Sequence, residues 1–262
     1  MNVLAHLWDR VSGSQPLPPA WLIGLTGIAA MLVVVNRQVW MWAGKVITIA
    51  HEGGHALVSV LSGRRLDGIR LHADSSGVTF SRGKRNGPGL VLTAAAGYVM
   101  PSLLGAGAAW LLAEQHLTAM LWLALVLLAA TFLAVRNAFG AVAVLVTAGA
   151  VFVISYYAPA IVQAAFAYLA VWFLLFGGLR PVLELIRSRG RSRAASRGRA
   201  GWSRDRDPRQ YRYRSPARIS DADQLAHLTG VPAAAWITGF TLVAVAAVAL
   251  GASLLAPPGW HL

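Results

Sequence analysis

Long apolar runs dominate the pattern of hydrophobic and polar positions along this chain. The runs are continuously apolar rather than alternating, so they indicate helices and not the strands of a membrane barrel. A helix crosses the hydrocarbon core of a bilayer with about 20 residues. We therefore predict an all-α integral membrane protein, a polytopic bundle of about seven transmembrane helices, with spans at 20–35, 42–61, 89–112, 118–135, 139–155, 159–178 and 233–256.

The distribution of Lys and Arg gives these spans a direction. Of the 23 basic residues, all except Arg37 and Lys45 fall in segments that would lie on the same side as the N-terminus in a seven-span arrangement. Cytoplasmic loops of membrane proteins carry such an excess of positive charge. The pattern predicts a multi-pass protein of the cell membrane with a cytoplasmic N-terminus and an outside C-terminus. The inside segments would be 1–19, 62–88, 136–138 and 179–232.

Composition supports the membrane assignment and limits the chemistry. Hydrophobic residues make up 56% of the chain and charged residues 13%, about half the share of a soluble protein. The chain has no cysteine, which excludes disulfides and thiolate metal ligands. Any metal must be held by His, Asp, Glu or backbone oxygen.

Two polar regions interrupt the spans. Residues 62–88 contain alternating apolar positions around Asp74-Ser75-Ser76-Gly77, which predicts a short cytoplasmic β-hairpin. Residues 179–219 are rich in arginine and poor in apolar side chains, which predicts a basic disordered linker. Such a segment beside a span attracts anionic lipid headgroups, so we expect no nucleic-acid partner despite the formal charge of +13.

A short helix is predicted between the linker and the last span. Ser220 is a typical N-cap residue, and Asp223 lies three positions later, as in a capping box. Gly230 and Pro232 end the segment. The predicted organisation is then an N-terminal segment, a membrane domain with six spans, the linker, and a short helix with the last span: 1–19, 20–178, 179–219 and 220–262.

The strongest chemical signal lies inside the second apolar run, where the sequence is His51-Glu52-Gly53-Gly54-His55. Histidines four residues apart share one face of a helix, where both can bind a single zinc ion. Glu52 is adjacent and could act as the general base toward a metal-activated water. Only 7 His and a few Glu occur in the chain, and ionisable residues are costly in a membrane helix. The motif therefore predicts Zn²⁺ as cofactor, in preference to a polar cluster that only bonds neighbouring helices.

A catalytic zinc usually takes a third protein ligand and keeps one position open. Spacing alone leaves that ligand undecided. Asp221 and Asp223 lie on the same side of the membrane as the motif, yet acidic residues at a helix start are equally explained by the helix dipole. The candidates are Asp221, Asp223, His227, His72, Asp67 and Asp74.

The chain resembles the M50 metallopeptidases, which are site-2-protease-like, and within them the M50B-like branch of bacteria and plants. The resemblance covers about residues 45–256 and is carried by the zinc motif with Ala56, by Ser76–Phe80, and by three further patches: Ala94-Ala95-Ala96-Gly97-Tyr98, Arg136-Asn137-Ala138-Phe139-Gly140 and Ser220-Asp221-Ala222-Asp223. Classical site-2 proteases take their third ligand from a Leu-Asp-Gly motif in a later helix. Here the only such motif, Leu66-Asp67-Gly68, directly follows the zinc helix. The resemblance instead implies Asp221 as the third ligand. It also suggests Asn137 as a substrate-positioning residue, although a helix-end hydrogen bond explains Asn137 as well.

The resemblance implies an intramembrane zinc metallopeptidase that hydrolyses peptide bonds of membrane-anchored protein substrates. The alternative is a catalytically inactive membrane scaffold that retains the metal site. A metal transporter is disfavoured, because a transporter needs ionisable residues along a path and the other spans are nearly free of them. The richness in Ala, Gly and Arg is associated with GC-rich genomes, and the absence of cysteine fits several bacterial lineages, so we expect a bacterial source.

Overall fold

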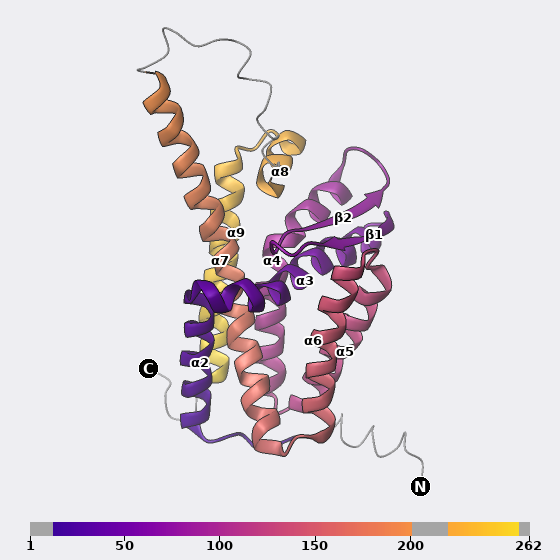
Figure 1. The fold of residues 1–262 in the computed structure, drawn as a ribbon, viewed down its shortest axis with the longest axis vertical. Helices are drawn as coiled ribbons and strands as arrows, with labels where there is room; N and C mark the ends of the chain where they lie inside the picture. Colours follow the sequence, from indigo (N-terminus) through magenta and orange to yellow (C-terminus); the bar gives the residue numbers. More distant parts are fainter. Residues whose placement is uncertain (1–12, 201–219, 257–262) are drawn as a thin grey trace.

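The computed structural model describes residues 13–200 and 220–256, and it is mainly helical (Figure 1). Five helices of the described residues are long and apolar enough to cross a membrane: α4 (Pro88–Ala113), α5 (Leu117–Ala134), α6 (Ala138–Tyr157), α7 (Ala160–Ala200, with the candidate span inside Ala160–Gly190) and α9 (Ala233–Leu255). Two further helices, α2 (Ala20–Val35) and α3 (Arg37–Leu61), meet the same criterion only as a pair. The part of the chain that the structure describes therefore holds five candidate spans, or six if the bent pair is one span, where hydropathy predicted seven.

The difference lies at the junction of α2 and α3, where the chain bends by 102° at Asn36. The Asn36 side chain accepts hydrogen bonds from the backbone N–H groups of Gln38 and Val39, so it ends one helix and starts the next. Arg180 of α7 braces the bend. Its guanidinium lies 4.4 Å from the centre of the Trp40 ring and donates to the Val34 carbonyl at the end of α2. Helix α3 then runs across the bundle instead of along it (Figure 1).

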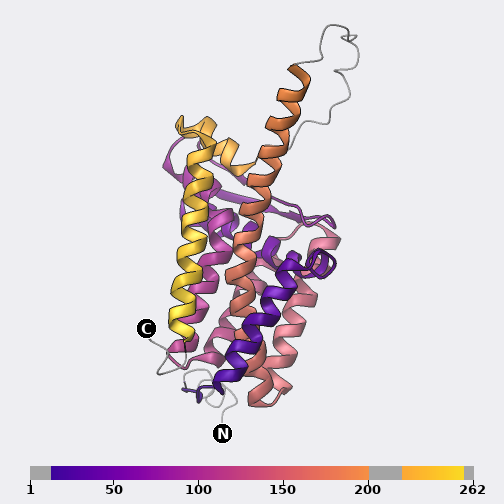
Figure 2. The same ribbon diagram turned by 90° about the vertical axis from the view of Figure 1, so that its left-hand side faces the viewer.

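With α2 and α3 counted as one broken span, the segment before α2 lies at the opposite end of the bundle from the hairpin. Gln15 hydrogen-bonds Gln115 and Thr118 at the turn between α4 and α5, whereas α3 ends at the hairpin. The start of α2 and the end of α9 share that lower end (Figures 1 and 2). The sequence predicts residues 1–19 on the same side as the hairpin. The structure corrects this for the described residues 13–19, which lie at the opposite end of the bundle.

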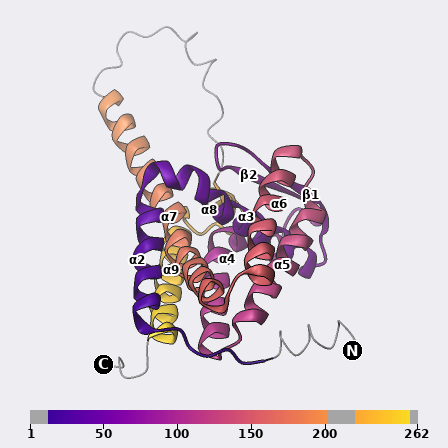
Figure 3. The ribbon, with the colours of Figure 1, turned by 60° about the horizontal axis from the view of Figure 1, so that its bottom comes forward.

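The long helices form two groups around α4 (Figure 3). Helices α2, α7 and α9 lie on one side of it, and the pair α5 and α6 lies on the other. Close packing in the first group depends on small residues. Leu175 of α7 is fully buried, and a Cβ at Gly105 of α4 or at Gly251 of α9 would meet its side chain. Large apolar side chains cover much of the outer surface, as expected for helices that face lipid.

The predicted hairpin is present as the antiparallel strands β1 (Arg65–Leu71) and β2 (Gly77–Arg82). It lies across the ends of α5 and α6. Ile69 forms a parallel bridge with Val135, and its carbonyl accepts the N–H of Arg136 at 2.8 Å. The inner face, with Ile69 and Leu71 buried, packs toward α3 and α6.

The structure corrects the predicted linker at 179–219. Helix α7 continues to Ala200, so the first half of that segment is helical and projects beyond the bundle (Figures 1 and 2). An i,i+4 ion pair between Arg180 and Glu184 and the good helix propensity of Arg, Leu and Ala favour this continuation. The remainder of the linker, 201–219, lies outside the described residues. The predicted short helix is α8 (Asp221–Thr229), with a complete capping box between Ser220 and Asp223 and Gly230 in the left-handed conformation at its end.

Helices α3 and α4 approach each other closely at Gly54. A Cβ there would lie 2.5 Å from Met100 Cβ and 3.2 Å from the Ala96 carbonyl oxygen. Both atoms are fixed to the backbone of α4, so Gly54→Ala should push the helices apart at a cost of about 1–3 kcal/mol. We expect a lower melting temperature for Gly54→Ala, measured in detergent by intrinsic fluorescence.

The adjacent glycine provides the control for this prediction. A Cβ at Gly53 would make only an ordinary contact, 3.6 Å from Thr131 Oγ1. Gly53→Ala should melt at or above the wild-type temperature, since alanine is the better helix former. Equal melting temperatures for the two variants would contradict close packing at Gly54.

Candidate metal centre

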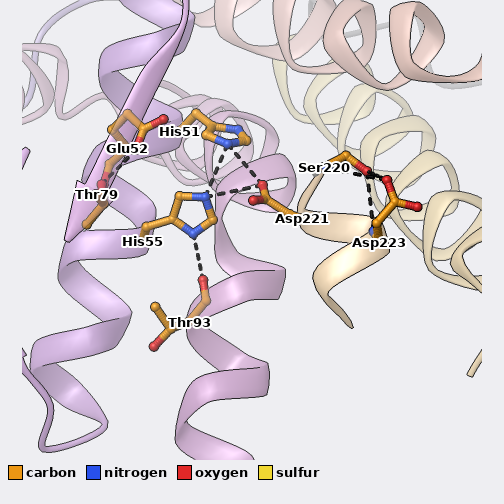
Figure 4. Close-up of polar contacts among 8 residues, drawn as sticks. All are labelled: His51, Glu52, His55, Thr79, Thr93, Ser220, Asp221 and Asp223. Atoms are coloured by element: carbon orange, nitrogen blue, oxygen red, sulfur yellow. Dashed lines mark hydrogen bonds and ion pairs between the residues drawn. The ribbon is translucent and has the colours of Figure 1, made fainter. Parts of the chain in front are cut away.

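Three side chains from two distant parts of the chain converge at the hairpin end of the bundle (Figure 4). His51 and His55 occupy one face of α3, and their Nε2 atoms lie 3.2 Å apart. Asp221, the first residue of α8, places Oδ2 3.2 Å from His51 Nε2 and 3.3 Å from His55 Nε2. His55 and Asp221 are 166 residues apart in the sequence, and the packing of α8 against α4 and α9 brings them together.

The spacing of these three atoms fits a tetrahedral metal ion. Zinc bonds to imidazole nitrogen and carboxylate oxygen are about 2.0–2.1 Å long, and a tetrahedron of that size has edges of about 3.3–3.4 Å. The three measured separations, 3.2, 3.2 and 3.3 Å, are close to those edges. Two nitrogens and one oxygen form a typical donor set of catalytic zinc, with a fourth position left for water or substrate.

A second hydrogen bond orients the His55 ring. His55 Nδ1 lies 2.7 Å from the carbonyl oxygen of Thr93 on α4. A carbonyl can only accept, so Nδ1 carries a proton, and Nε2 in its deprotonated form directs its lone pair to the candidate site. Backbone carbonyls commonly play this part behind metal-binding histidines. The His51 ring is supported differently, by an edge-on contact with Tyr98, which in turn stacks on Phe240 of α9.

Gly97 leaves the space that the two imidazoles occupy. A Cβ at this position of α4 would collide with His55 Nε2 and lie 2.6 Å from His51 Nε2. The absence of a side chain at Gly97 thus allows α4 to close one wall of the centre against the ligand nitrogens. This fit supports a metal at His51, His55 and Asp221, the one group of candidate ligands found among the described residues.

The carboxyl group of Asp221 is held in its charged form. Burial would raise its pKa, but hydrogen bonds and charge interactions with His51 and His55 outweigh that effect and hold the pKa well below its usual range. An ionised carboxylate is the form that binds a cation.

Glu52 lies on the other side of the histidine pair from Asp221 (Figure 4). Its side chain is buried, and Oε2 accepts a 2.7 Å hydrogen bond from Thr79 Oγ1 on β2. A Cβ at Gly77 would lie 2.6 Å from Glu52 Oε1, so the start of β2 passes directly over the carboxylate. The hairpin therefore fixes Glu52 beside the candidate ligands. Thr79 bonds Oε2 and not Oε1.

A large cavity connects this centre to the surface. Its volume is about 1040 Å³, and it runs along α3 from His55 past Thr48 to Trp40. Residues 75–81 of the hairpin form one wall, and Ser220, Asp221 and Gln224 of α8 form another. Such a space admits an extended peptide segment rather than a water molecule alone.

The family model described as Peptidase M50B-like matches residues 24–251, which is most of the chain. The chain belongs to this M50B-like peptidase family. The match contains both halves of the candidate centre, the histidines of α3 and the aspartate of α8. No curated protein and no solved structure matches the chain.

Membership of the M50B-like family agrees with the resemblance drawn from the sequence, and the geometry narrows the choice of third ligand in this M50B-like chain. Asp221 joins the histidines, whereas the other candidates are engaged elsewhere. Asp223 closes the capping box and pairs with Arg189, Asp67 pairs with Arg82, and the Asp74 carboxylate accepts bonds from Ser76 in the hairpin turn. Neither His72 nor His227 belongs to the cluster.

Asn137 does not line the cavity. Its side chain forms two hydrogen bonds with the backbone of Leu71: Leu71 N–H donates to Oδ1 at 3.1 Å, and Nδ2 donates to the Leu71 carbonyl at 2.7 Å. Asn137 therefore fastens the end of β1 to the start of α6. These contacts favour a structural part for Asn137 over the substrate-positioning one suggested by the resemblance.

Sequence reasoning missed Thr93, Gly97, Thr79 and Tyr98 as parts of the centre. Gly97, Tyr98 and Thr79 were noticed only within patches of the M50B-like resemblance, without a role. Thr93 acts through a backbone carbonyl, which no residue type encodes. Thr79 sits in the predicted hairpin, and only the packing of β2 over α3 reveals its bond to Glu52.

Proposed function

We propose that this protein is an intramembrane zinc metallopeptidase that hydrolyses peptide bonds in membrane-anchored protein substrates. One observation carries the proposal: His51, His55 and Asp221 place their ligand atoms at the edge lengths of a tetrahedral zinc site, with Glu52 alongside. Membership of a peptidase family and several membrane-crossing helices support it.

The depth of the centre suggests where a substrate is cut. Four exposed aromatic residues lie near helix ends away from the hairpin, as is typical of a membrane–water boundary: Trp21, Trp110, Tyr156 and Tyr157. Along α4, Thr93 precedes Trp110 by 17 residues, or about 26 Å of helix. The hydrocarbon core is about 30 Å thick. The centre therefore lies a few ångströms inside the hairpin-side boundary, and cleavage falls near that end of a substrate helix.

The orientation follows from the basic residues. The hairpin, the α5–α6 junction and the extension of α7 lie at one end of the bundle, and they carry most of the Lys and Arg of the described residues. The positive-inside rule makes this end cytoplasmic. The start of α2 then faces the other side of the membrane, which reverses the orientation predicted for the N-terminus. Attraction of the arginine-rich segment to anionic lipid headgroups stays a prediction.

The chemistry assigns each side chain one task. A zinc ion bound here would act as a Lewis acid that polarises the scissile carbonyl and acidifies the attacking water. Glu52 accepts the proton of that water on Oε1 while Thr79 holds Oε2. As the C–N bond breaks, Glu52 returns the proton to the leaving amine, so the base is regenerated. Thr93 keeps the proton of His55 on Nδ1 throughout.

The edge of β2 offers a place for the substrate backbone. Its residues line the cavity, and among the described residues β2 pairs with β1 alone. An extended peptide that adds to a free strand edge gains backbone hydrogen bonds. A peptide bound along β2 would pass Glu52, because Gly77 and Thr79 are the β2 residues that contact its carboxylate.

Zinc content tests the proposal. We expect about one zinc per wild-type chain purified in detergent, measured by mass spectrometry, and less than about a tenth of that for His55→Ala and Asp221→Ala. Removing a ligand leaves too few donors for tight binding. Asp67→Ala serves as the matched control, since Asp67 was also a candidate ligand in the sequence but pairs with Arg82 on the hairpin. Folded wild-type protein without zinc, or equal zinc in wild type and Asp221→Ala, would refute the assigned centre.

A further inference from the structure

The third candidate ligand is carried by an element that cannot hold its own position. Helix α8 has nine residues, and isolated helices of that length are unstable in water. In sequence it follows α7 only after residues 201–219. Asp221 therefore reaches the histidines because contacts from other helices fix α8 in place.

The extension of α7 shares one apolar cluster with α8. Ala222 and Leu225 of α8 are fully buried in a cluster that includes Val182 of α7, with Leu185 packed against it. Residues 182, 185 and 189 follow an i, i+3, i+7 spacing, which places them on one stripe of the helix. The third member of that stripe is Arg189.

Arg189 adds a charged contact. Its Nη2 pairs with Asp223 Oδ1, while Asp223 Oδ2 accepts the Ser220 hydroxyl at 2.6 Å. Both carboxylate oxygens of Asp223 are thus engaged, one within α8 and one from α7. Asp223 lies two residues from Asp221 in the first turn of α8, so this pair holds the turn that presents the ligand.

We propose that Arg189 is a positioning residue that holds α8, through Asp223, in the place where Asp221 can complete the metal centre. The part of this inference that concerns metal rests on the proposed function. The part that concerns the docking of α8 does not. The extension of α7 then helps to hold α8 at the metal centre, in addition to leading to the last span.

Zinc affinity, measured by competition with a chromophoric chelator, tests the first part. Partners behind metal ligands change affinity by up to 10–100-fold, and a half-exposed ion pair contributes less than a buried one. We expect Arg189→Gln to weaken zinc binding about three- to tenfold, Arg189→Lys to recover most of it, and Arg187→Gln, the same charge change on the same helix, to have no effect. High salt should reduce the difference between wild type and Arg189→Gln.

A double-mutant cycle tests whether Arg189 changes zinc affinity through Asp223. If Arg189 acts through Asp223, then Arg189→Gln should cost nothing further in an Asp223→Asn background. An equal loss in both backgrounds, or equal losses for Arg189→Gln and Arg187→Gln, would overturn the proposal.

Hydrogen exchange of the α8 amides in EDTA tests docking without metal. We expect exchange across residues 221–229 to be about three- to tenfold faster in Arg189→Gln than in wild type and unchanged in Arg187→Gln, since a weaker dock opens more often. This result would stand even if wild type bound no zinc, which would refute the proposed function alone. Unchanged exchange in Arg189→Gln would refute the positioning role even if wild type bound zinc.

Discussion

Replacing Glu52 with glutamine is expected to lower the rate constant for peptide cleavage by about 10²–10⁴-fold, the usual contribution of a general base. Glutamine has the same shape and can still accept the hydrogen bond of Thr79, but it cannot take a proton from water. Zinc content should remain at the wild-type value, because Glu52 is not among the three candidate ligands. Cleavage of a panel of single-span peptides in proteoliposomes, under single-turnover conditions, measures the effect.

Glu184→Gln is the matched control for this substitution. Glu184 lines the same cavity, but it pairs with Arg180 of α7 and lies apart from the candidate ligands. It should retain wild-type cleavage. Cleavage by Glu52→Gln at more than half the wild-type rate would remove Glu52 from the mechanism, while a loss of zinc in that variant would show that the substitution disturbs the centre itself.

Gly97→Ala is expected to weaken zinc binding by about 100-fold or more, although it adds only a methyl group far along the sequence from every ligand. The methyl group would occupy the space of the two Nε2 atoms. Either the imidazoles turn away or α4 moves outward and carries the Thr93 carbonyl with it. Both responses spoil the ligand geometry, and orientation of ligands strongly affects metal affinity. Chelator competition on the purified variant gives the affinity.

Gly107→Ala on the same helix isolates this effect, because a Cβ at Gly107 would meet nothing within 4 Å. It should bind zinc like wild type and melt no earlier. If Gly97→Ala bound zinc as tightly as Gly107→Ala, the close approach of α4 to the imidazoles would be wrong.

Local sequence patterns predicted the elements whose signals are local. Alternation around Asp74–Gly77 gave the hairpin, and Ser220 with Asp223 gave the capped start of α8. The helical spacing of His51 and His55 also gave two of the three candidate ligands. In each case the residues that determine the structure are a few positions apart.

The sequence predictions were wrong or undecided where contacts between residues far apart in the sequence determine the structure. Hydropathy measures how apolar a helix is and not where it points, so it treated α2 and α3 as two crossings and missed the bend at Asn36. The arginine-rich segment after Pro181 looked disordered by composition, yet Val182 and Leu185 share an apolar cluster with α8, and Arg189 pairs with Asp223. Spacing left Asp221 and Asp223 equivalent, and only the fold separates a residue that faces the histidines from one that faces Arg189.

The bend between α2 and α3 has a consequence for the surrounding lipid. Helix α2 has 16 residues and is about 24 Å long, several ångströms short of a bilayer core. Past its end the chain turns sideways at Asn36 and Arg37, both polar and exposed to the surroundings. A hydrophobic segment that is too short draws the two leaflets together. We therefore expect the acyl chains beside α2 to be compressed relative to those around α5 and α6, with a local thinning of the bilayer on the flank where Trp40 lines the cavity.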